Sequence, residues 1–425
     1  MSQVLIDQAR RVMEGNDRGS YTVPTHGLYP FQWNWDSALS ALGFSHFDMD
    51  RAWVEIETLM AHQWDDGMVP HIVFHEPDDG YFPGPEVWQT GRPVPTTGIT
   101  QPAVAGFALR KLYDRAEDKA VARARLTELL PKVHAWHQWF YRDRDPENTG
   151  LVAIIHPWES GRDNSVDWDE GLDAVPIEGV APFTRRDTTH ANPDHRPSDE
   201  QYKCYIWLVE HFRGLGWDNT KLHDASPFRL VDPGFNGILT RSCDDVADLA
   251  DVLGNLSIAS EARAMATKGR EALESLWNPA LGQYTCYNRV TGRLQDTPSV
   301  GGLLAAVADV PDVRAEALAR RIGLLAERCG YLVPSHDPAN DTFDSQRYWR
   351  GPTWLIVNYM IAEGLARSGQ TEMAKRIHAN SLHLIEKSGF AEYYDPISGE
   401  PCGGSSFTWT AAMVIEILKN LKVAA

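Results

Sequence analysis

The stretch GPTWLIVNYMIAEGLARSGQTEMAKRIHANSLHLIEKS, residues 351–388, carries the pattern that indicates the fold. Apolar residues recur at three- and four-residue spacing in 351–367 and again in 371–388, which predicts two helices. Pro352 suits the first turn of the first helix, and Thr371 suits the cap of the second.

The same helical character recurs along the chain, giving roughly twelve helices, with Asp50 and Ser406 as further caps. The other helical segments are 5–14, 35–43, 51–63, 101–113, 115–139, 200–212, 244–253, 257–276, 313–327 and 406–421. Aromatic and acidic loops recur between them. We therefore predict an all-α protein whose helix pairs close into an α/α toroid, with long loops at one end lining a central cavity.

No linker or low-complexity tract divides residues 1–425, so we expect one catalytic domain. Two long polar segments, 65–98 and 161–198, are rich in proline or glycine. Long loops inside a domain usually serve as lids or binding loops. We expect these two insertions to cover the cavity.

Bulk composition excludes several classes of protein. With 43% hydrophobic residues the chain has ample core, and no run of about 18 apolar residues predicts a membrane span. The N-terminus lacks the features of a signal peptide, and the five cysteines show no CxxC spacing, so we expect a reduced, cytoplasmic protein. The net charge of −18 argues against nucleic acid and anionic membranes as partners. A homo-oligomer is compatible with this sequence.

Cofactor motifs are missing from the sequence. The histidines form no HExxH pattern, and neither a P-loop nor a GxGxxG stretch is present. We therefore expect no metal and no cofactor. The 15 tryptophans fit a site for a small glycoside, because an indole face stacks on the C–H face of a sugar ring, although large helical cores use tryptophan too.

Two loops far apart in the chain combine carboxylates with aromatic rings: HPWESGRDNS at 156–165 and FAEYYDPISGE at 390–400. Cleavage of a glycosidic bond needs a general acid and a second carboxylate. Asp163 and Glu392 are our candidates, while Glu159, Asp395 and Glu400 remain open from local sequence. The alternative interpretation is that each loop is a charged, solvated turn.

Three more segments fit a sugar site. FQWNWD at 31–36 and QRYWRGPTW at 346–354 combine aromatic rings with polar groups, although their tryptophans could be plain core. RPSDEQY at 196–202 places Arg196 and Tyr202 around a helix start, where a guanidinium and a phenol could receive a carboxylate. A surface ion pair is the alternative for Arg196.

These loops resemble glycoside hydrolase family 63. The resemblance rests on ESGRDNS (159–165), YWRGPTW (348–354), EYYDPISGE (392–400) and FTWTA (407–411), and it extends from residue 31 to 411. It implies an (α/α)6 barrel and inversion at the anomeric carbon, with Asp163 as general acid and Glu392 as general base. Inversion implies carboxyl groups roughly 6.5–9.5 Å apart, which leaves room for water.

The compact length is similar to the bacterial mannosylglycerate and glucosylglycerate hydrolases of that family. The resemblance implies that Arg196 and Tyr202 hold a glycerate carboxylate and that Gln101, Tyr348 and Trp349 lie around the substrate. We expect Trp35, Asp36 and Trp349 to hold the hexose. Phe31 departs from it, since a tyrosine is expected before Gln-Trp. The expected substrate-binding residues are Phe31, Gln32, Trp35, Asp36, Gln101, Trp158, Glu159, Gly161, Arg196, Tyr202, Tyr348, Trp349, Trp354 and Trp409.

We therefore expect an inverting α-glycosidase that releases a hexose and glycerate. One alternative is a trehalase-like or oligosaccharide α-glucosidase, which would cleave neutral disaccharides and be indifferent to loss of Arg196. Another alternative is a sugar-binding toroid without catalysis.

Overall fold

The structure, a computed structural model, describes residues 2–186 and 192–423. Part of the expected lid at 161–198, residues 187–191, lies outside this range. Within the described residues, six helices form an inner ring. They are α2 (Asn34–Phe44), α5 (Ala105–Arg115), α11 (Pro233–Leu253), α13 (Val300–Leu304), α15 (Leu355–Arg367) and α17 (Thr408–Val423). Each contacts the next in this order, and α17 contacts α2, so the ring is closed.

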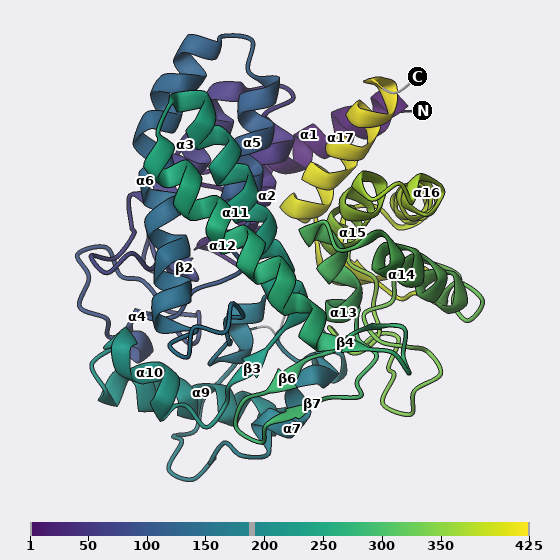
Figure 1. The fold of residues 1–425 in the computed structure, drawn as a ribbon. Coiled ribbons are helices and arrows are strands. Elements are labelled where there is room, and N and C mark those ends of the chain that lie inside the picture. Colours follow the sequence, from purple (N-terminus) through teal and green to yellow (C-terminus); the bar gives the residue numbers. More distant parts are fainter. Residues whose placement is uncertain (1, 187–191, 424–425) are drawn as a thin grey trace.

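An outer helix follows each of the first five inner ones along the chain, and the outer helix α1 precedes them all. Helices α3, α6, α12 and α16 pack on the inner helix that precedes them, α1 packs on α17, and α14 takes the remaining outer place (Figure 1). The outer helices are α1 (Ser2–Asn16), α3 (Met49–Met60), α6 (Lys119–Asp143), α12 (Leu256–Leu273), α14 (Asp312–Leu325) and α16 (Thr371–Ser388). The predicted (α/α)6 barrel is therefore confirmed.

Sequence pattern separates the two rings. Every residue of α2 is buried, because an inner helix is covered by neighbours on all sides. By contrast, α1 buries one stripe that includes Leu5, Ile6, Ala9 and Met13, at the spacing of a single helical face. The inner helices thus form the core, and the outer helices shield it from water.

Two predicted helices have another extent or place in the fold than expected, and one observed inner helix was not predicted. The segment 244–253 is the second half of α11, which begins at Pro233 with the Asp232 carboxylate accepting from the Gly234 amide at 3.0 Å. The segment 200–212 forms α9 (Asp199–Gly214), which belongs to neither ring. Helix α13 was not predicted, because five residues with two glycines carry little helical pattern.

Short elements gather at one end of the barrel, seen at the bottom of Figure 1, where α4, α9, α10 and the β3–β6–β7 sheet lie. In the described ranges, the remaining helices are α4 (Pro85–Trp88), α7 (Asp169–Leu172) and α10 (Asn219–Ala225), with 3-10 turns η1 (Pro157–Ser160), η2 (Val166–Trp168), η3 (Pro193–His195), η4 (Glu274–Leu276) and η5 (Ala305–Ala308). The strands are β1 (Gln32–Trp33), β2 (Ile72–Val73), β3 (Leu230–Val231), β4 (Trp277–Asn278), β5 (Gln283–Tyr284), β6 (Tyr287–Asn288), β7 (Arg293–Leu294), β8 (Ala391–Tyr394) and β9 (Pro401–Ser405).

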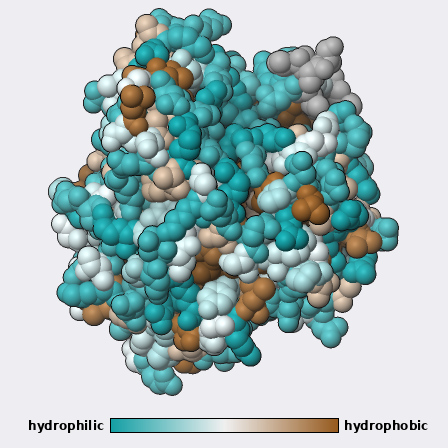
Figure 2. Space-filling model, viewed as in Figure 1, coloured by the Kyte–Doolittle hydropathy of each residue, from teal (hydrophilic) through white to brown (hydrophobic). Residues whose placement is uncertain are grey.

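The surface carries no large apolar area on the face drawn in Figure 2, where hydrophobic residues form small separate groups among hydrophilic ones. Nor does any helix in the described ranges combine the length and the apolar character that crossing a bilayer requires.

Candidate active site

One cavity, with about 850 Å³ of empty space including the part open to solvent, lies where several inner helices begin. Its lining comes from the segments that lead into α2, α5, α15 and α17 and from parts of 71–88 and 158–202. Helix N-termini carry partial positive charge, which favours carboxylates placed near them. The cavity lining includes eleven of the sixteen predicted site residues: Trp35, Asp36, Gln101, Trp158, Gly161, Asp163, Arg196, Tyr202, Tyr348, Glu392 and Trp409.

Glu392 lies in β8, at an irregularity in its pairing with β9. Such bulges re-aim a side chain next to many active sites. The Gly404 amide donates to Oε2 at 2.9 Å, and the Tyr29 hydroxyl donates to Oε1 at 3.0 Å. Arg196 Nη1 lies 3.6 Å from the same Oε1. These donors give the carboxylate of Glu392 a defined orientation at the cavity wall.

Gly403, in the neighbouring strand β9, leaves room for the Glu392 carboxylate. A Cβ on Gly403 would lie 2.3 Å from Glu392 Oε2, and φ at this position is +72°. A side chain is therefore excluded both by contact and by the left-handed backbone.

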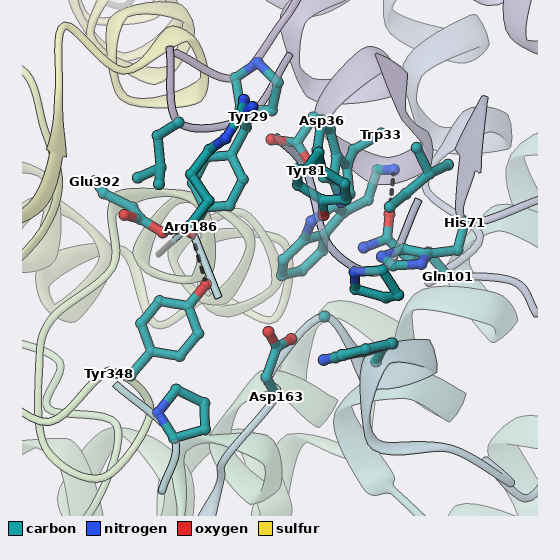
Figure 3. A pocket seen from close by; sticks show the side chains of 18 of the residues that line it. Tyr29, Trp33, Asp36, His71, Tyr81, Gln101, Asp163, Arg186, Tyr348 and Glu392 are labelled. Atoms are coloured by element: carbon teal, nitrogen blue, oxygen red, sulfur yellow. Dashed lines mark hydrogen bonds between the residues drawn. The ribbon is translucent and has the colours of Figure 1, made fainter. Parts of the chain in front are cut away.

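Asp163 is half-buried and enters the cavity from a different side than Glu392 (Figure 3). It follows the turn η1, which ends at Gly161 with φ +68°. A Cβ on Gly161 would lie 2.6 Å from the Trp35 indole, so glycine lets this loop pass the ring. The Tyr205 hydroxyl on α9 donates to the backbone oxygen of Asp163 at 2.8 Å.

Asp36 is the third carboxyl group of the cavity, in the first turn of α2. Burial raises the pKa of Asp36 well above its usual range, and the nearby charge of Glu392 raises it further. Its Oδ1 is buried without a hydrogen-bond partner among the described residues. Since buried polar atoms are normally paired, this oxygen fits a sugar hydroxyl. Beside it, Gln101 Oε1 accepts from the Trp35 amide at 3.1 Å.

Arg196 and Tyr202, the expected receptor of a carboxylate, both line the cavity. Arg196 Nη2 donates to the Tyr29 hydroxyl at 2.6 Å, and its guanidinium lies 4.0 Å from the centre of the Tyr348 ring. The Tyr202 hydroxyl donates to the Phe82 carbonyl at 3.3 Å. Arg196 therefore lies beside Glu392 and contacts Tyr29, which donates to Glu392. The sequence did not predict that Arg196 and Glu392 are neighbours.

Five predicted binding residues lie behind the cavity wall instead of in it. Each of them is at most 1% exposed: Phe31, Gln32, Glu159, Trp349 and Trp354. Trp349 and Trp354 stack on each other at 3.8 Å between ring centres, as a plain core interpretation predicts. Glu159 forms a buried ion pair with Arg144 at 3.0 Å. Gln32 contacts His75 at 2.7 Å and the Glu55 carboxylate at 3.4 Å.

The competing carboxylates Asp395 and Glu400 do not line the cavity either. Asp395 Oδ1 accepts from the Ile397 amide at 2.8 Å within its own turn, and Glu400 is exposed. Among the described carboxylates, the cavity lining includes only Asp36, Asp163 and Glu392.

Several cavity residues were missed from the sequence, above all Tyr29, His71, Tyr81 and Arg186. Burial, and to a smaller extent His156, lowers the pKa of His71 well below its usual range, so its imidazole is neutral. Tyr29 lies two residues before Phe31, and its hydroxyl occupies the cavity that Phe31 does not reach. A tyrosine near the FQW segment was thus the available signal.

Arg186 joins two of the cavity loops. It forms an ion pair with Asp78, and its Nη1 also donates to the Gly27 carbonyl at 3.3 Å. Arg186 lowers the pKa of Asp78. Within the described residues, no group of three or more His, Cys, Asp or Glu side chains is arranged to hold a metal ion.

Comparison with known proteins gives consistent results. Residues 29–410 match the model of the mannosylglycerate hydrolase MGH1-like glycoside hydrolase domain. Mannosylglycerate hydrolase MGH1 of Selaginella moellendorffii is 45% identical over 98% of this chain and 86% of its own length. Glucosylglycerate hydrolase of Mycolicibacterium hassiacum is 32% identical, over 97% of both chains.

A solved structure is similar as well. The GH63 mannosylglycerate hydrolase from Thermus thermophilus, in complex with Tris and D-glycerate, superposes with a TM-score of 0.94 at 45% identity, over 97% of this chain and 99% of the other. With the barrel and its carboxylate-lined cavity, these matches show that the chain belongs to the MGH1-like glycoside hydrolases of family 63.

Proposed function

We propose that this protein hydrolyses the α-glycosidic bond of a hexosyl glycerate, with inversion at the anomeric carbon. The proposal is supported chiefly by Asp163 and Glu392, which face one cavity from segments 229 residues apart. An inverting glycosidase needs such a pair, one to protonate the leaving oxygen and one to activate water. The glycerate part rests on the names of the relatives and on the D-glycerate bound to the Thermus enzyme.

In the proposed reaction, Glu392 takes a proton from a water molecule while the oxygen of that water bonds to the anomeric carbon. The bond from that carbon to the glycosidic oxygen breaks, and Asp163 gives its proton to this oxygen. Hexose and glycerate leave, and the two carboxyl groups exchange their protonation states. Tyr29 and the Gly404 amide, the donors to Glu392, would keep its lone pair aimed at the water.

For the hexose we propose Asp36, Trp35 and Trp409 as binding groups, with Gln101 and Gly161 shaping the same wall. Tyr202 and Arg196 are proposed for the glycerate carboxylate. Trp158 and Tyr348 complete the lining. The other five predicted residues would act from behind the wall, by holding the lining in place.

We also propose that residues 1–425 work as one catalytic domain, with 65–98 and 161–198 as lids. Asp78 and Arg186 lie in these two segments, and their ion pair supports the idea that the segments cover the cavity together.

Reducing-sugar release from glucosylglycerate, mannosylglycerate, trehalose and kojibiose tests the proposal, with Asp163→Asn as the blank. Release from a glycerate glycoside alone is the expected result, and it would also identify the hexose. Release from the neutral disaccharides alone would favour the trehalase-like alternative. The first-formed anomer, followed by NMR, should be β from an α-linked substrate, and an α product would refute inversion.

A further inference from the structure

Arg162, the neighbour of the proposed acid Asp163, has a fully buried side chain that does not line the cavity. Its guanidinium lies between two carboxylates, with Nη1 3.0 Å from Asp167 Oδ2 and Nη2 2.8 Å from Asp232 Oδ2. All three side chains are about 1% exposed. A buried triad of this kind carries a net negative charge and needs compensation from its surroundings.

The compensation comes from the ends of two inner helices. Asp232 caps α11, where its Oδ1 accepts from the Gly234 amide at 3.0 Å. The Ser299 hydroxyl caps α13 and donates to Asp167 Oδ2 at 2.5 Å. Positive helix N-termini favour both carboxylates. Through the triad, the loop of Asp163 is therefore joined to α11 and α13.

Further contacts fix the same residue. The Trp168 indole N–H donates to the Arg162 carbonyl at 2.6 Å, and its ring lies 5.0 Å from the guanidinium carbon. A Cβ on Gly301 would lie 2.4 Å from Arg162 Nη2. The guanidinium thus occupies space that α13 leaves open with a glycine. Side chain and backbone of Arg162 are both held, one residue from Asp163.

We propose that Arg162 is a positioning residue for the general acid, and that its carboxylate triad sets the place of Asp163 relative to the glycosidic oxygen. The inference rests on the proposed function, because it assumes Asp163 as the acid. A displaced acid fails to protonate its leaving group, whereas water attack assisted by Glu392 continues. Replacement of Arg162 should therefore lower kcat more for a substrate whose leaving group needs a proton than for one whose leaving group does not.

Arg162→Lys keeps the charge but cannot reach both carboxylates with one fork. We compare kcat on the glycerate glycoside with kcat on the α-fluoride of the same hexose, since fluoride departs with little protonation. Misplacement of a catalytic group by about 1 Å costs on the order of 100-fold. We expect kcat to fall by about 10- to 100-fold on the glycoside and by less than about threefold on the fluoride. Asp163→Asn should show the same selectivity.

Arg51→Lys is the matched control. Arg51 is also buried between two carboxylates, at 2.9 Å from Asp17 and 2.6 Å from Glu55, and it does not line the cavity. Its replacement should change kcat on each of the two substrates by less than about threefold. If Arg162→Lys does not fold, Asp167→Asn replaces it, because it removes one arm of the triad without changing side-chain size.

An equal loss on both substrates in a folded Arg162→Lys variant would overturn the inference, since it would mean a general structural role. Unchanged activity on both would overturn it too. A wild-type protein inactive on both substrates would instead refute the proposed function, and the inference with it.

Discussion

Replacing Tyr29 by phenylalanine removes one hydroxyl from the surroundings of Glu392 and leaves the ring in place. That hydroxyl donates to Glu392 Oε1 at 3.0 Å and accepts from Arg196 at 2.6 Å. A hydrogen bond to a charged group contributes about 1.5–3 kcal/mol. If this contribution acts on the base in the transition state, kcat should fall by about 10- to 150-fold, with KM nearly unchanged.

The assay is initial-rate kinetics on the glycerate glycoside that the wild type cleaves best. Tyr359→Phe serves as the matched control, because the Tyr359 hydroxyl donates to the buried Glu416 at 2.9 Å, and Tyr359 does not line the cavity. The control should lose stability in urea unfolding but keep kcat within about twofold.

Two results would refute the reasoning on Tyr29. A kcat within about twofold of wild type would show that the hydroxyl does not support the base. A large rise in KM with normal kcat would show that Tyr29 binds substrate in ground and transition state alike.

Three further predictions concern single positions. Gly403→Ala should lower kcat by about 100-fold, because its Cβ would lie 2.3 Å from Glu392 Oε2, and steady-state kinetics would detect this against near-normal circular dichroism. Gly161→Ala should weaken hexose binding and destabilise the fold by about 1–3 kcal/mol in urea, since φ is +68° and its Cβ would meet the Trp35 indole at 2.6 Å; wild-type stability would contradict this. Burial lowers the pKa of His137 from 6.5 to about 3. Between these two pH values, His137 is therefore protonated in the unfolded chain and neutral in the folded one. The free energy of unfolding should therefore drop by up to about 1.4 kcal/mol per pH unit from pH 6.5 towards 3, and His137→Gln should flatten that slope in urea titrations at pH 7, 6 and 5.

Local pattern was enough for most of the barrel. Outer helices such as α16 bury one face and expose the other, so their periodicity is visible in the sequence. Inner helices lack that contrast, and the first half of α11 went unrecognised because Pro233, Gly234 and Gly237 disguise a helix that is buried all round. Glycines in α13 hid it for the same reason, since they serve close packing rather than helix formation.

For the cavity, too, some features could be predicted from the sequence and others could not. Loops dense in carboxylates and aromatic rings could be recognised one by one, and Asp163 and Glu392 do face one cavity. Which tryptophans would face it could not be predicted, because an indole suits a sugar and a core equally well. Trp349 and Trp354 lie in the core and do not line the cavity. The contact of Arg196 with Glu392 joins residues 196 positions apart, and no local signal records it.

The closure of the inner ring by α17 against α2 has a consequence for how the protein is made. On the ribosome, α2 leaves early and α17 late, so the flank of α2 that α17 covers stays bare through most of translation. Tyr29 and Asp36 are synthesised long before Glu392, which they face in the cavity and whose strand precedes α17. Contacts between such distant segments form slowly. Until β8 has been synthesised, a nascent chain therefore lacks Glu392, the proposed general base.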